Sequence, residues 1–191
     1  MKNRKLIIQK NLEEHQAVFK IIEKKLIKKI IDVSKICIDT IKNKKKIFFF
    51  GNGGSAADAQ HLATELVVRF EKNRKPIPAI SLSADNSLIT ACSNDFSFDK
   101  IFSKQIEALG QQGDLAIAIS TSGKSKNVIE AIKVCKNKKI NVILLTGKNK
   151  FLYEENCNQV INVPSSSTAR IQEAHIFIGH MLCKFIEDSD E

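Results

Sequence analysis

Two patterns of hydrophobic and polar positions divide this chain into a helical beginning and a mixed remainder. From residue 12 to residue 41, apolar residues recur at steps of three and four, as at Phe19, Ile22 and Leu26. This spacing is typical of one face of an amphipathic helix. Lysines fill many of the other positions. We therefore expect residues 1–45 to form a long helical region whose apolar face packs on its own domain or on a second copy of the chain.

The rest of the chain alternates between short apolar runs and longer helical patterns. The apolar runs, which are typical of strands buried on both faces, lie at residues 47–50, 79–82, 115–119, 142–145 and 160–163. The helical patterns lie at residues 55–70, 87–93, 98–109, 125–137 and 168–186. This alternation predicts an α/β fold with a doubly wound, mostly parallel five-stranded sheet flanked by helices. We expect a single domain over residues 1–191, in which residues 46–191 form the α/β core.

The amino-acid composition limits the expected cellular location of the protein and the classes of partner that it binds. The longest apolar run has five residues, Leu115 to Ile119, whereas a membrane span needs about 18. The first ten residues lack the apolar segment of a secretion signal, so we expect a cytoplasmic protein without membrane association. The five cysteines are scattered and form no C-x-x-C pair, which favours free, buried thiols. The net charge of +9 comes mostly from lysines, with one Tyr and no Trp for base stacking, so we expect no nucleic-acid partner.

Two loops at expected strand ends could bind an anion. The first is Gly51-Asn52-Gly53-Gly54-Ser55, in which Ser55 is the expected helix N-cap, with Asp58 three residues later. The second is Ser120-Thr121-Ser122-Gly123-Lys124-Ser125, which offers four hydroxyls beside a helix start. Loops of this kind meet at the carboxyl edge of a parallel sheet, where free backbone amides attract phosphate.

Each loop has competing interpretations. Gly51, Gly53 and Ala56 satisfy a loose dinucleotide fingerprint, but no acidic residue closes a second strand about 20 residues later. A P-loop ending at Ser125 would need its first glycine at Ala118, inside the strand. A hydroxyl-rich loop suits a phosphate monoester better. The remaining alternative is that these hydroxyls only cap a helix.

Polar side chains on apolar helices form the second group of candidates. His61 and Glu65 are four residues apart, on one helix face, where they could bind a metal or a substrate. The last helix carries Gln172, His175 and His180. A surface hydrogen bond between His61 and Glu65, or a buried structural histidine at position 180, is the simpler interpretation of each alone.

Together these residues resemble a known family. Gly51-Asn-Gly-Gly-Ser55, His61-Leu-Ala-Thr-Glu65, Asn94-Asp95-Phe96, Ser120-Thr-Ser-Gly-x-Ser125 and Arg170-Ile-Gln-Glu173 with His180 resemble the phosphoheptose isomerases, which are sugar-isomerase (SIS) domain enzymes. The resemblance runs in order over nearly the whole chain. It implies a SIS-type fold and conversion of sedoheptulose 7-phosphate to D-glycero-D-manno-heptose 7-phosphate. It also implies zinc dependence and a homotetramer that serves bacterial surface-heptose synthesis.

The resemblance also implies roles for individual residues. Glu65 and His180 are the implied base and acid of a ketose-to-aldose isomerisation. The implied zinc ligands are His61, Glu65, Gln172 and His180. The implied substrate-binding residues are Asn52, Gly53, Gly54, Ser55, Glu65, Asn94, Asp95, Ser120, Thr121, Ser122, Ser125 and Gln172.

Two features depart from this pattern. Some relatives carry Asp where this chain has Ala169, and Thr168 is the candidate for that polar role. Gln172 and His180 are eight residues apart, about 12 Å along a regular helix, so one helix cannot easily bring both to one ion. Either the helix is irregular, or only some of these groups bind metal at a time, or another subunit supplies one of them.

Two other functions compete with the isomerase. A non-catalytic SIS protein that associates with the bacterial replication initiator is similar in the glycine-rich loop, and a regulator that senses a sugar phosphate is the third possibility. The first group lacks the acid and base equivalents, whereas this chain has both Glu65 and His180. No helix-turn-helix pattern supports a regulator. The residues therefore favour the enzyme.

Overall fold

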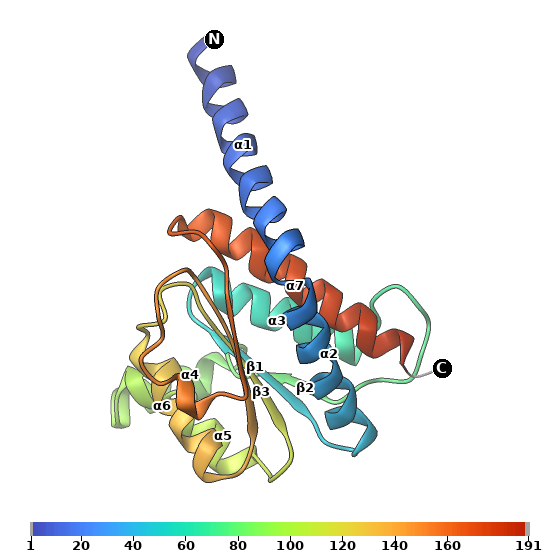
Figure 1. Cartoon of the computed structure of the whole chain (residues 1–191). Coiled ribbons are helices and arrows are strands. Elements are labelled where there is room, and N and C mark those ends of the chain that lie inside the picture. The colour runs from blue at the N-terminus through green and yellow to red at the C-terminus, as the bar shows by residue number, and fades with distance from the viewer. Residues whose placement is uncertain (1, 190–191) are drawn as a thin grey trace.

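The computed structural model describes residues 2–189 and contains one five-stranded parallel sheet (Figure 1). All five predicted strands are confirmed, and they lie in the order β2-β1-β3-β4-β5. In the register of the central pair, Phe49 lies opposite Ile117. The sheet is doubly wound, as predicted, because the chain moves outward from β1 on one side and from β3 on the other. The strands are β1 (Ile47–Gly51), β2 (Ala79–Ser81), β3 (Leu115–Ser120), β4 (Asn141–Thr146) and β5 (Gln159–Asn162).

Helices cover both faces of this sheet. On one face lie α2 (Ile27–Lys42), α3 (Gly54–Val67) and α7 (Thr168–Asp188), and on the other lie α5 (Ser103–Leu109) and α6 (Lys126–Asn137). Side chains alternate between the two layers, so Ile47 and Phe49 pack with α3 and α7 whereas Phe48 and Phe50 pack with α5 and α6. Both faces are buried, which explains why the strands are continuous apolar runs.

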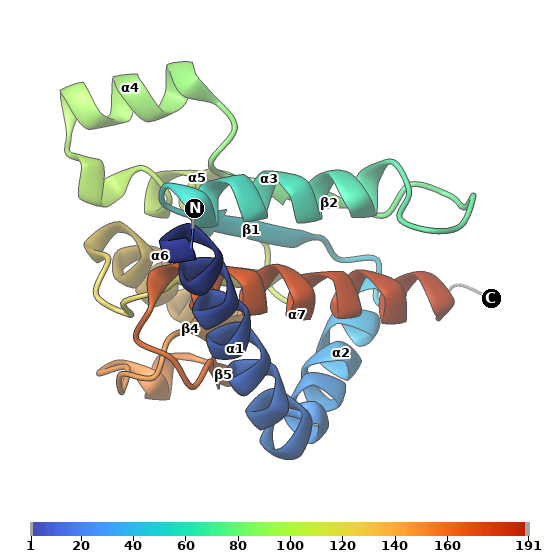
Figure 2. The same ribbon diagram turned by 90° about the horizontal axis from the view of Figure 1, so that it is seen from above.

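The predicted amino-terminal helical region is confirmed, and it is divided into two helices. It consists of α1 (Lys2–Lys25) and α2, which meet at Leu26 and diverge as the two arms of a V (Figure 2). The N–H groups of Leu26 and Ile30 keep helix-type bonds, to Ile22 and Leu26, so the bend needs no glycine or proline. It occurs because α1 packs on α7, whereas α2 packs on α7 and also on strands β1 and β5.

Two other helices differ in their bounds from the prediction. The pattern at residues 98–109 is interrupted, since a 3-10 turn at Phe98–Lys100 precedes α5. The pattern at 87–93 is the longer helix α4 (Asn86–Asp95), whose N-cap Asp85 accepts a bond from the Leu88 N–H at 2.9 Å. A further 3-10 turn spans Glu154–Asn156.

The hydrophobicity of the helices and the burial of the cysteines concern two further expectations from composition. None of the helices within residues 2–189 is long and apolar enough to cross a bilayer. The cysteines are free, and four of the five are buried while Cys157 is half-buried, as expected.

Candidate functional site

The two candidate loops meet where the winding of the sheet reverses. Strands β1 and β3 are neighbours, and the helices that follow them, α3 and α6, cover opposite faces. Their loops therefore leave the carboxyl edge of the sheet in opposite directions, which is the usual ligand position in such folds. We call residues 51–55 the glycine loop and residues 120–125 the hydroxyl loop.

Backbone geometry explains the composition of the glycine loop. Gly53 has φ +55°, which side-chain-bearing residues rarely adopt. A Cβ on Gly54 would lie 2.1 Å from Gln172 Nε2, so the Gln172 side chain packs directly on this backbone. The structure therefore brings Gln172, from the start of α7, to the glycine loop.

One prediction about this loop is wrong. The N-cap of α3 is Gly53, and Ser55 lies in the first turn, where it is buried. The positive φ of Gly53 lets the chain enter the helix two residues earlier than the serine suggested. Asp58 is half-buried, and burial raises its pKa to about 6 against the opposing effect of His61. Because Ser55 is not the N-cap of α3, Asp58 has no capping role with it.

Several hydroxyls of the hydroxyl loop bond to one another or to the backbone of the loop. Ser125 is the N-cap of α6, but its side chain makes no capping bond, so the capping-only interpretation is wrong for this residue. Its hydroxyl instead accepts a bond from Ser120 Oγ at 3.2 Å. Ser122 Oγ accepts the Lys124 N–H at 3.1 Å and is otherwise exposed. Hydroxyls and helix-start amides are thus grouped at one place, as phosphate binding requires.

Asn127 is a residue of this site that the sequence reasoning missed. It is 2% exposed, and its amide pairs in both directions with that of Asn52, at 2.9 and 2.8 Å. Its Oδ1 also accepts the Val128 N–H. Its only sequence signal is an amide on the otherwise apolar buried face of the helix.

The histidine cluster lies between α3 and α7. His61 Nε2 is 3.0 Å from His180 Nε2 and 3.2 Å from Glu65 Oε1. The two helices approach closely at Gly179, where a Cβ would lie 2.5 Å from Leu62 Cδ1. Burial and the neighbouring His61 lower the pKa of His180, while Glu65 opposes this shift. The structure thus unites three of the four predicted metal ligands.

Gln172 lies apart from this cluster within the chain. Helix α7 continues from Thr168 to Asp188, so Gln172 and His180 are about 12 Å apart along its axis. The two imidazole Nε2 atoms face each other, as a shared proton or a shared ion would require. Two imidazoles and a carboxylate are donors that zinc accepts. Even so, within residues 2–189 no group of three or more His, Cys, Asp or Glu side chains is arranged around a metal position.

The remaining candidates lie near the ends of α4 and α7. Asn94 and Asp95 are exposed and bonded to each other, with Asn94 Nδ2 2.8 Å from Asp95 Oδ1, and Figure 2 shows α4 standing off the sheet. Thr168 and Ala169 are exposed in the first turn of α7. The substrate roles of Asn94, Asp95 and Thr168 stay predictions.

Comparisons with known proteins agree with this architecture. Residues 11–147 match the SIS domain family. The chain is 50% identical over 182 residues to a phosphoheptose isomerase of Nitratiruptor sp., covering 95% of this chain and 97% of that one. It is 47% identical to the phosphoheptose isomerase of Campylobacter concisus, with 97% of each chain covered. The solved phosphoheptose isomerase of Neisseria gonorrhoeae superimposes with a TM-score of 0.91 and 37% identity, over 96% of this chain and 98% of that one. The expected resemblance is confirmed, and the chain belongs to the phosphoheptose isomerases of the SIS domain family.

Proposed function

We propose that this protein isomerises sedoheptulose 7-phosphate to D-glycero-D-manno-heptose 7-phosphate, in the cytoplasm, for bacterial surface-heptose synthesis. The observation that carries the proposal is the contact of Glu65 and His180 with His61, between α3 and α7. A non-catalytic SIS protein would not need a carboxylate and an imidazole at one place. The names of the relatives support the choice of substrate.

The hydroxyl loop suits the phosphate end of this substrate. Its serine and threonine hydroxyls and the first amides of α6 can satisfy a dianion without a P-loop glycine.

Glu65 and His180 supply the proton transfers. The Glu65 carboxylate takes a proton from C1 while the protonated imidazole of His180 donates one to the oxygen on C2, which gives an enediol. Glu65 then returns its proton to C2, and His180 takes the proton of the hydroxyl on C1, which becomes the aldehyde carbon. The same two groups thus complete the reaction and recover their starting states.

We propose zinc as the cofactor, with His61, Glu65 and His180 as ligands from this cluster. Because a protonated imidazole or carboxyl group does not bind zinc, only some of these groups bind the metal at a time. Gln172, the fourth predicted ligand, lies against Gly54 in this chain, and we propose that it contacts the substrate there. A bound zinc would supply Lewis acidity toward the substrate oxygens. Loss of bound zinc in His61→Ala, measured as metal content per chain, tests the ligand assignment.

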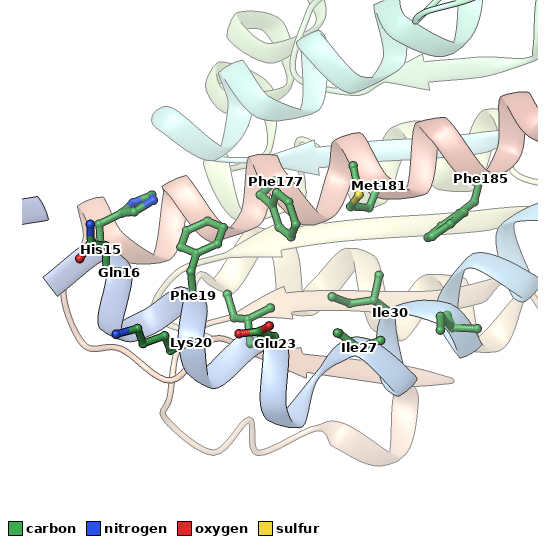
Figure 3. A pocket seen from close by; sticks show the side chains of 12 residues that line it. His15, Gln16, Phe19, Lys20, Glu23, Ile27, Ile30, Phe177, Met181 and Phe185 are labelled. Carbon is green, nitrogen blue, oxygen red and sulfur yellow. The ribbon is translucent and has the colours of Figure 1, made fainter. Parts of the chain in front are cut away.

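A homotetramer is the proposed assembly, and exposed apolar surface supports it. The first half of α1 projects from the body (Figure 1) and exposes Leu6, Ile7, Ile8 and Leu12. A groove of about 610 Å³ continues this surface between α1, α2 and α7 (Figure 3), and Phe19, Phe177 and Phe185 line it. At its end, Arg170 and Glu173 bind α1 through Asn11 and His15.

Direct assay tests the proposed reaction. Zinc-reconstituted protein should convert sedoheptulose 7-phosphate to the aldose, identified by NMR. Glu65→Gln and His180→Gln should each lower kcat by about 10²- to 10⁴-fold, because each removes a proton-transfer group at nearly constant volume. Glu155→Gln, which neutralises an exposed carboxylate in the second 3-10 turn, is the matched control. Wild-type rates in both site variants, with metal content unchanged, would contradict these roles.

A further inference from the structure

Glu187, near the end of α7, is a buried carboxylate that the proposed reaction does not use. Its side chain is 1% exposed, and its two oxygens accept the backbone N–H groups of Phe70, Glu71 and Lys72 at 2.9–3.1 Å. Burial alone would raise the pKa of Glu187, but these three bonds and the nearby Arg74 lower it. An ionised carboxylate on α7 therefore holds the segment that follows α3.

Arg74 joins this carboxylate to the helix that carries Glu65. Its Nε lies 3.2 Å from Glu187 Oε1, and its side chain is 7% exposed. Its two terminal nitrogens donate to the carbonyls of Glu65 and Leu66, each at 2.7 Å. These carbonyls belong to the last turn of α3, where no further helical N–H is available to them. Arg74 thus fixes the backbone of Glu65 itself.

The same segment also reaches His180. The Phe70 ring stacks on the His180 imidazole, with centroids 5.4 Å apart and planes 28° apart, and the Phe70 N–H is one of the three that Glu187 accepts. We propose that Glu187 and Arg74 are positioning residues: they lock residues 70–74 so that Phe70 orients His180 while Arg74 orients Glu65. This inference rests on the proposed roles of Glu65 and His180.

Kinetics and histidine NMR test the proposal on the full-length, zinc-loaded protein. Glu187→Gln should lower kcat about 10- to 100-fold with KM within about twofold, since the hydroxyl loop is untouched. Phe70→Leu should act in the same direction, because it removes the stacked ring but keeps all bonds of Glu187. Both variants should displace the His180 ring signals, which the Phe70 ring current shifts in the wild type.

Two controls separate this role from general stabilisation of the segment. Phe70→Tyr keeps an aromatic ring over His180 and should retain wild-type kcat and His180 signals. Glu71→Gln removes the exposed ion pair with Lys184 but keeps the Glu71 N–H on Glu187, so it should also behave as wild type.

Wild-type behaviour of the variants would overturn the positioning role of Glu187 and Arg74. A folded Glu187→Gln with wild-type kcat and His180 signals would overturn it. If Glu187→Gln does not fold, Phe70→Leu decides, and wild-type values there would overturn it equally. If the wild type fails to isomerise the heptulose phosphate, the proposed function is wrong. The His180 signals then decide the positioning role alone. Displaced signals in Glu187→Gln and Phe70→Leu would support it, and unchanged signals would overturn it.

Discussion

The amides of Asn52 and Asn127 form a reciprocal pair that joins the two loops of the site. Each Nδ2 donates to the Oδ1 of the other, at 2.9 and 2.8 Å, across 75 residues of sequence. Asn52 belongs to the glycine loop and Asn127 to the first turn of α6. Because the pair joins the loops that follow β1 and β3, it holds the two loops at a fixed separation.

Asn127→Leu should therefore weaken both stability and substrate binding. The change leaves the Asn52 amide and the Val128 N–H without their partner, which costs about 1–3 kcal/mol in the free energy of unfolding. KM for the sugar phosphate should rise because the two loops lose their link. Denaturant unfolding and steady-state kinetics measure the two effects. Asn137→Leu, at the exposed end of the same helix, is the control, and equal behaviour of the two variants would contradict the role of the pair.

The hydroxyl loop predicts a contrast between two neighbouring side chains. Ser122→Ala should raise KM by about 10- to 100-fold, because a hydrogen bond to a charged phosphate contributes about 1.5–3 kcal/mol. Lys124→Ala should change KM by no more than about twofold, since its exposed side chain is not needed in a loop that lacks P-loop spacing. Kinetics with the sugar phosphate measures both. A larger effect of Lys124→Ala would return the P-loop interpretation to consideration.

The exposed face of α1 predicts how the assembly can be broken. Ile8→Glu combined with Leu12→Glu should lower the molar mass in light scattering from four copies of 21.4 kDa to a smaller species, because charges would enter an apolar interface. Lys5→Glu, an exposed polar position on the same helix, should leave the mass unchanged. A wild type that is monomeric would contradict the proposed tetramer.

Mixing inactive variants tests which chain supplies the proton-transfer groups. Glu65 and His180 both contact His61 of the same chain. Co-assembly of Glu65→Gln with His180→Gln subunits should therefore restore no activity, because every cluster keeps one defect. Recovery of turnover in mixed oligomers would show that the pair comes from two chains.

His175 predicts an acid-dependent loss of stability. It is fully buried near Thr146, and burial lowers its pKa to about 4 from 6.5, against the hydrogen bond at the Thr146 carbonyl. The unfolded chain thus binds the proton first, so stability is complete above pH 6.5 and falls as the pH drops toward 4, by about 3 kcal/mol. His175→Gln should remove this part of the pH dependence. Unfolding curves of the two proteins between pH 7 and pH 4 test it, and parallel losses would contradict it.

Local pattern determined much of this protein. Every strand and the alternation of strands with helices could be predicted, because burial on both sheet faces requires apolar residues at each position, as in Ile47 to Phe50. The positions of both loops followed from the same alternation. Motif order predicted the family, and the pairing of His61 with Glu65 followed from the spacing of four residues.

Tertiary structure alone decided the relations between distant segments. The bend at Leu26 arises from different packing partners, and no local residue marks it. Gly53 replaced Ser55 as the N-cap because a backbone angle, which composition does not specify, set the start of α3. The contacts of His61 with His180, Asn52 with Asn127 and Glu187 with residues 70–72 join positions 75 to 119 residues apart. Such contacts depend on how helices pack across the sheet, which the periodicity of one segment cannot specify.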